Sequence, residues 1–252
     1  MYEMKHILFI FLAFMPLYMW AQVPTVNPLG TYYLIGDDGK EETGNVNEQT
    51  LSSPFKVVFT ANPSIPDGYK SQVWYEWTLW KTDDPNNILL RRNDQDFEYE
   101  FNESGSYAVQ LRAIFYGEEG VNEDYEFPSD GEDAKLIGFT VSESKLEFPN
   151  GISPNGDGKN DELKPKDGYK SIVSFHAVIF NRWGQRLYSW DDVHGSWDGK
   201  VNGKVVKDGV YFLNVSAKGA DGIDYKIKKA INVISGYNNG ENENGSTDGS
   251  GE

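Results

Sequence analysis

Residues 74–80 read Trp-Tyr-Glu-Trp-Thr-Leu-Trp, and this stretch decides the fold class. Successive side chains of a β-strand point to opposite faces of a sheet, so one face here carries Tyr75, Trp77 and Leu79. The other face mixes tryptophan with polar residues. This alternation predicts a half-buried strand, with Trp77 as the buried tryptophan of a β-sandwich.

Short runs of the same kind lie on both sides of this stretch, and turn-forming residues separate them. The turns include residues 62–68 and 83–87, which are rich in Pro, Asn, Asp and Gly. The further strands predicted in this half are 32–35, 55–60, 97–101, 107–115 and 136–141. Several short strands in one segment predict a β-sandwich domain at residues 23–145.

Residues 97–111 sharpen the prediction. Aromatic residues alternate with acids at 97–101, and after Gly105 the residues Tyr107, Val109 and Leu111 share one face. This pattern resembles the PKD domain, and the resemblance implies an immunoglobulin-like fold that is common in surface proteins. The long acidic insertion at 117–133 departs from a compact domain of that family.

Two chemical functions are open to this half of the chain. Trp74 and Trp80 on one strand face could stack on sugar rings, or could simply pack on the strand face. Glu98 and Glu100 could form a glycosidase pair, although acids two residues apart on a strand are usually solvated. The chain has no Cys, and residues 23–145 have no His, which excludes thiol catalysis and a Ser-His-Asp triad there. We therefore predict no enzyme, with a small polysaccharide-acting enzyme as an open alternative.

The second half contains four motifs in order. They are Ser-Pro-Asn-Gly-Asp-Gly-Lys-Asn-Asp at 153–161, Ile-Phe-Asn-Arg-Trp-Gly at 179–184, Trp-Asp-Gly at 197–199 and Gly-Val-Tyr-Phe-Leu at 209–213. Together they resemble the gliding-motility-associated C-terminal domain, the type B sorting domain of type IX secretion, at residues 146–236. The resemblance implies a β-sandwich and export to the surface or outside of a Bacteroidetes-type bacterium. It also implies translocon and shuttle proteins as partners, after which the domain can be removed.

The motif residues are the candidate contacts with that machinery. They are Asn181, Arg182, Trp183, Gly184, Trp197, Asp198 and Gly199. For the two tryptophans, packing over the ends of the sandwich is the alternative. For the whole protein, two roles stay open: a cargo that binds glycans or other surface proteins, and a component of the secretion or gliding apparatus itself.

The opening motif also has the spacing of a calcium loop. The candidate oxygen ligands are Ser153, Asn155, Asp157 and Asp161, with Gly158 at the position that permits the sharp turn. Only two of these side chains carry charge, so calcium would bind weakly. The alternative is a turn in which the side chains bond to the loop's own backbone.

The sequence therefore predicts an all-β protein with two consecutive β-sandwich, immunoglobulin-like domains. The two ends of the chain and its charge distribution add further predictions. Residues 1–21 have the layout of a secretory signal peptide, and residues 237–252 form a polar acidic tail predicted to be disordered. Residues 23–147 carry 24 acids and 9 bases, whereas residues 148–236 carry 10 acids and 13 bases. The acidic half would repel nucleic acid, and no further stretch predicts a transmembrane segment.

Overall fold

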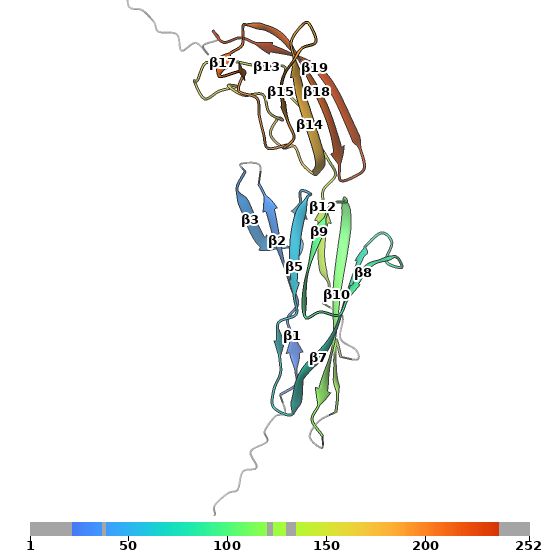
Figure 1. Ribbon diagram of the computed structural model, residues 1–252. Helices are drawn as coiled ribbons and strands as arrows, with labels where there is room; N and C mark the ends of the chain where they lie inside the picture. The colour runs from blue at the N-terminus through green and yellow to red at the C-terminus, as the bar shows by residue number, and fades with distance from the viewer. Residues whose placement is uncertain (1–21, 37–38, 120–122, 130–134, 237–252) are drawn as a thin grey trace, which may run out of the picture.

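The computed structural model describes residues 22–36, 39–119, 123–129 and 135–236, so the predicted signal peptide and acidic tail lie outside the described residues. All helical or extended elements within these ranges are β-strands, and none is a helix, which confirms the all-β class. Two hydrophobic cores form, one from Val26 to Val141 and one from Leu146 to Val233. They belong to an N-terminal and a C-terminal domain arranged end to end (Figure 1).

The N-terminal domain packs two sheets against each other. The first sheet has the order β3-β2-β5-β9, and the second has the order β4-β12-β10-β7-β8 with β11 also on β10. The small pair β1-β6 lies beside them. The strands are β1 Thr25–Val26, β2 Leu29–Ile35, β3 Glu41–Asn45, β4 Thr50–Leu51, β5 Phe55–Thr60, β6 Pro63–Ser64, β7 Tyr69–Lys81, β8 Ile88–Arg92, β9 Asp96–Phe101, β10 Gly105–Gly117, β11 Tyr125–Phe127 and β12 Ile137–Val141.

Two residues mark this domain as immunoglobulin-like. Trp77 on β7 is 1% exposed, donates its indole N–H to the Gln95 carbonyl at 3.2 Å and packs edge-on against Phe97, with the ring centroids 5.5 Å apart. Tyr107, at the start of β10, donates its hydroxyl to the Glu103 carbonyl at 2.7 Å. In immunoglobulin-like sandwiches, one hallmark is a buried tryptophan on strand C, the position of β7 here. Another is a tyrosine near the start of strand F, the position of β10, whose hydroxyl bonds back to the backbone a few residues upstream. The strand pattern of the sequence predicts the buried Trp77, whereas the bond of Tyr107 is found only in the structure.

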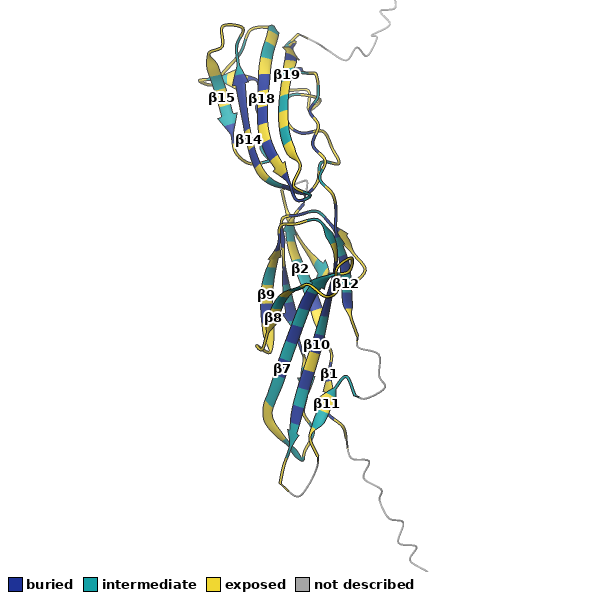
Figure 2. Ribbon diagram, turned by 90° about the vertical axis from the view of Figure 1, so that its right-hand side faces the viewer, coloured by how far each residue is buried: buried dark blue, intermediate teal, exposed yellow. Residues whose placement is uncertain are grey.

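The C-terminal domain is built on one five-stranded sheet. Its order is β13-β19-β18-β14-β15, and the short hairpin β16-β17 forms a separate pair. The strands are β13 Gly151–Ile152, β14 Ile172–Phe180, β15 Arg186–Trp190, β16 Lys200–Val201, β17 Lys204–Val205, β18 Gly209–Gly219 and β19 Asp224–Val233. Buried and exposed residues alternate along β18, as Figure 2 shows, so one face of this sheet lies on a core and the other faces solvent.

Loops supply most of the layer opposite this sheet. Leu163 and Trp197, both 0% exposed, are joined by a bridge between two connections that carry no long strand. These connections cover the core from the side opposite β14 and β18 with little regular structure of their own. The second layer of this domain is therefore much less regular than the two sheets of the N-terminal domain.

Candidate functional site

The turn between β14 and β15 presents the most exposed tryptophan of the described residues. The Asn181 side-chain oxygen accepts hydrogen bonds from the backbone N–H groups of Trp183 and Gln185, each at 3.0 Å. Gly184 takes a φ of +79°, which favours glycine, and its N–H donates to the Asn181 carbonyl at 3.0 Å. Asn181 and Gly184 therefore hold the turn rigid and hold residues 182 and 183 at its tip.

Trp183 is 80% exposed, and the Arg182 guanidinium lies over its ring at 5.3 Å from the centroid. Beside the pair is a groove of about 240 Å³, whose lining includes Leu187, Val206 and Lys207. A solvent-exposed indole contributes little to the stability of the folded domain, because the stabilisation comes from apolar area that is buried. Tryptophan and arginine are also the residue types enriched at binding hot spots. This turn is therefore the candidate recognition site, as the sequence predicts for residues 181–184.

The Trp-Asp-Gly motif has a different role, which corrects a prediction. Trp197 is 0% exposed, and its indole N–H donates to the Lys200 carbonyl at 3.0 Å, so the folded domain cannot present it to a partner. Asp198 pairs with Lys200 at 2.9 Å, and Gly199 has a φ of +71° with Pro154 packed where a side chain would begin. These three residues shape a turn and close the core. The packing alternative is correct for Trp197 and wrong for Trp183.

The opening loop at 153–161 is held by its own hydrogen bonds. One oxygen of the Asp161 carboxylate accepts the N–H groups of Asn155 and Gly156 at 3.0 and 2.7 Å, and the other accepts that of Gly158 at 2.8 Å. Asp157 accepts the Lys159 N–H at 2.8 Å, and the Ser153 hydroxyl donates to the Lys159 carbonyl at 3.1 Å.

The calcium site at these four residues stays a prediction. Calcium needs six to eight oxygen atoms that converge on one point, whereas the four candidate side chains bond to the loop backbone. The geometry favours the alternative, a turn made by side-chain-to-backbone bonds.

The backbone N–H groups of Gly156 and Gly158 hold the pKa of the Asp161 carboxyl below its ordinary value. A lowered folded-state pKa means that the stabilisation is present above the unfolded-state value of about 3.9. It is lost as the pH falls below that value toward the folded-state pKa. The loop should therefore loosen in acid, before the apolar core of the domain does.

A comparison of two alanine variants tests the loop. We expect Asp161→Ala to lower the melting midpoint of the full chain more than Asp157→Ala, because Asp161 accepts three backbone N–H groups and Asp157 accepts one. Calcium in the millimolar range, where extracellular calcium modules bind, should leave the midpoints of the parent and both variants unchanged relative to EDTA. A rise with calcium that Asp161→Ala abolishes would restore the metal site.

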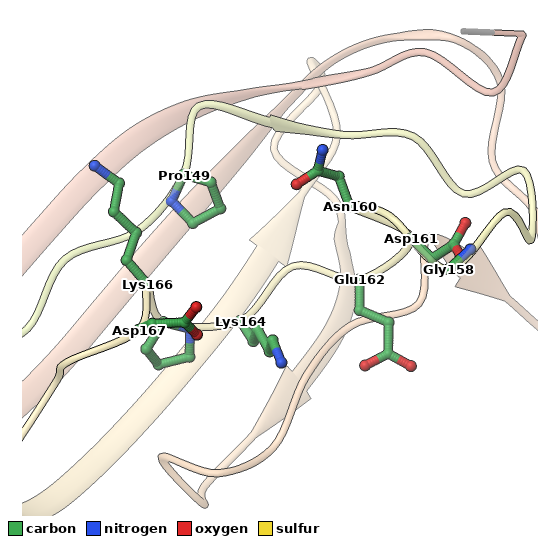
Figure 3. A pocket seen from close by; sticks show the side chains of 9 residues that line it. Pro149, Gly158, Asn160, Asp161, Glu162, Lys164, Lys166 and Asp167 are labelled. Atoms are coloured by element: carbon green, nitrogen blue, oxygen red, sulfur yellow. The ribbon is translucent and has the colours of Figure 1, made fainter. Parts of the chain in front are cut away.

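A surface hollow of about 500 Å³ lies next to this loop (Figure 3). Its labelled lining side chains include Glu162, Lys164 and Lys166, so charges of both signs are mixed. Glu162 accepts the Ser196 hydroxyl at 2.6 Å, and Lys166 pairs with Glu147 at 3.4 Å. The lining residues include no Ser, Thr, Cys, Tyr or His.

The predicted aromatic platform lies on the outer face of β7. Trp74 and Trp80 are both half-buried there, and the Arg112 guanidinium lies over the Trp74 ring at 5.6 Å from the centroid. One face of that ring is therefore covered. Sugar binding at Trp74 and Trp80 stays a prediction.

Residues 146–243 match the family model described as the CHU_C Type IX secretion signal domain. The match begins at the residue expected from the four motifs and extends past residue 236. No curated protein matches this chain.

Two solved structures have low similarity to the chain. Drosophila N-cadherin EC1-4 is 14% identical with a TM-score of 0.22, over 74% of this chain and 48% of that chain. A tetra-tandem repeat in the extending region of a large adhesion protein is 9% identical with a TM-score of 0.25, over 84% of this chain and 68% of that chain. The present chain thus spans about half of the cadherin chain. At these TM-scores neither likeness bears on activity or partners.

The fold and the family match together define the class: an all-β protein whose residues 146–243 match a type IX secretion signal domain. Residues 146–243 resemble that signal domain in sequence, which confirms the resemblance to the sorting domain. In the described part of the chain, no helix has the length and apolar character to cross a membrane. The PKD resemblance of the N-terminal domain stays a prediction.

Proposed function

We propose that this protein is a non-catalytic cargo of type IX secretion, carried across the outer membrane of a Bacteroidetes-type bacterium by its C-terminal domain. The translocon and its shuttle are the proposed partners. The N-terminal immunoglobulin-like domain is the passenger, with a binding or structural role at the surface. The observation that supports this proposal most directly is the family match at residues 146–243.

The turn at 181–184 is the proposed contact with the machinery. β14 has nine residues and leads from the N-terminal domain to this turn, which places the turn about 30 Å away at the far end of the C-terminal domain. At that distance the passenger does not block the approach of a partner to Trp183. The exposed indole supplies apolar contact area, and Arg182 supplies a charge for the rim of the contact.

Export of the full chain with an internal tag tests this role. We expect Trp183→Ala to accumulate in the periplasm, because losing a hot-spot tryptophan costs about 2 kcal/mol of binding, or roughly thirtyfold in affinity. The matched control is Ile223→Ala, which removes another exposed apolar side chain at the opposite end of the same domain. Cell fractionation followed by immunoblotting gives the surface and periplasmic shares.

The outcomes separate the alternatives. Export of Trp183→Ala at the parental level, with a normal melting midpoint, would remove this turn from the recognition site. Export of a chain truncated after residue 145 would overturn the sorting role. Stable co-purification of the exported chain with outer-membrane translocon proteins would favour the alternative that it is a component of the apparatus.

A further inference from the structure

Buried polar contacts join the two domains, and Ser171 is at their centre. This residue precedes β14, is 1% exposed and has a φ of +53°. Its hydroxyl accepts the Ser53 N–H at 3.2 Å and bonds to the Ser142 hydroxyl at 2.8 Å, while its own N–H donates to the Ser52 hydroxyl at 2.7 Å. Ser52 and Ser53 belong to the N-terminal domain, and Ser142 directly follows its last strand, β12. A buried hydroxyl with this many partners fixes the position of β14 relative to that domain.

A second set of contacts lies at the β18–β19 turn. The Asp221 carboxylate accepts both the N–H and the hydroxyl of Ser144, at 2.8 and 2.7 Å, and the Ser144 hydroxyl also meets the Tyr225 hydroxyl at 2.9 Å. Burial acts to raise the pKa of Asp221, but the hydrogen bonds from Ser144 and from the backbone of the turn together outweigh it and lower the pKa. Next to this turn, the Ser104 N–H donates to the Ala220 carbonyl at 3.0 Å. We call the contacts of Ser171 and Asp221 together the joint.

The linker between the two domains is short, and most of its backbone N–H groups are hydrogen-bonded. Val141 ends the first core at 1% exposure and Leu146 begins the second at 5%, so only residues 142–145 lie between the cores. The N–H groups of Ser142 and Lys145 donate to the carbonyls of Leu51 and Lys170, at 2.9 and 3.0 Å. The Ser144 N–H donates to Asp221, so three of the four linker N–H groups have a hydrogen-bond acceptor. The short reach of residues 142–145 leaves no slack for a protease to draw the linker into its cleft.

We propose that the joint shields this linker, so that a protease does not separate the two domains and the C-terminal domain stays on its passenger. The consequence for the exported form rests on the proposed function. The shielding itself concerns only the folded chain. It differs from the arrangement of a flexible linker, in which domains move freely and cleavage releases the passenger.

Limited proteolysis of the purified full chain tests the proposal. Trypsin can cut after Lys145 and a Glu-specific protease after Glu143, because both side chains are exposed although the backbone is held. In Gly219→Ala the new Cβ would lie 2.1 Å from the Ser144 hydroxyl oxygen and must displace it. Asp221→Ala removes the acceptor of Ser144. The matched control is Ser216→Ala, an exposed position on β18.

We expect the linker of the parent and of Ser216→Ala to outlast the exposed turns. In the two joint variants, cleavage at Glu143 or Lys145 should be at least roughly tenfold faster, because cutting follows the population of the opened joint. Mass spectrometry of the fragment that begins at residue 144 or 146 identifies the cut. Asp221→Asn preserves the shape of the side chain and serves if Gly219→Ala fails to fold, as judged by circular dichroism.

Cutting of the parental linker as fast as that of the variants would overturn the proposal, and so would equal resistance of all four chains. Since the assay needs no secretion, it can fail while the export test succeeds. The export test can also fail while the proteolysis assay succeeds. A chain that is not exported but whose linker resists proteolysis would refute the sorting role and leave the shielding proposal standing.

Discussion

Trp77→Ala should unfold the N-terminal domain at a temperature well below that of the parent. The side chain is 1% exposed and its ring centroid lies 6.1 Å from that of Phe59 and 5.5 Å from that of Phe97. Removing a buried aromatic side chain costs about 3–5 kcal/mol, because transfer free energy is lost and a cavity remains. The Gln95 carbonyl also loses the indole N–H that it accepts. Thermal unfolding of the full chain, followed by circular dichroism, measures the loss.

The same strand offers a matched control. Trp74→Ala removes a tryptophan from the outer face of β7, where it is half-buried and contacts Arg112. A cation–π contact at such a site is worth about 0.5–1 kcal/mol, so this variant should lose far less stability than Trp77→Ala. Equal losses would mean that the two faces of β7 are buried alike, against the alternation along the strand.

The alternation of the sequence predicts the main strands of the N-terminal domain well. Residues 55–60 form β5 within the predicted bounds, and the faces of β7 and β10 are as predicted because one face of each must be buried. The alternation does not predict β3 and β8. β3 carries charged residues and no apolar face, and β8 is a five-residue edge strand in which Leu90 packs against the core, so pattern alone does not reveal them.

The candidate site was harder to predict for a physical reason. The sequence offers two tryptophans beside turns, Trp183 and Trp197, with the same local chemistry. Burial separates them, and burial depends on the bridge between Leu163 and Trp197, which joins segments far apart in the chain. The joint was also missed, since its serines become important only when Ser52, Ser142 and Ser171 meet across two domains. The sequence shows only that the two predicted domains, 23–145 and 146–236, follow each other directly.

Trp197→Ala should abolish export by unfolding the C-terminal domain rather than by removing a contact. Its side chain is 0% exposed, its ring centroid lies 5.7 Å from that of Tyr211, and its backbone pairs with Leu163. The expected loss is about 3–5 kcal/mol, a large part of the stability of a domain of this size.

The pair Trp197→Ala and Trp183→Ala then separates stability from recognition. Both variants should fail to reach the surface, but only Trp197→Ala should lower the melting midpoint, by roughly 12–40 °C for a loss of about 3–5 kcal/mol. Trp183→Ala should melt like the parent, because its side chain is 80% exposed and little apolar area is lost from the core. If Trp183→Ala lowered the midpoint as much as Trp197→Ala, the turn would be structural, and its export defect would no longer indicate a contact with the translocon.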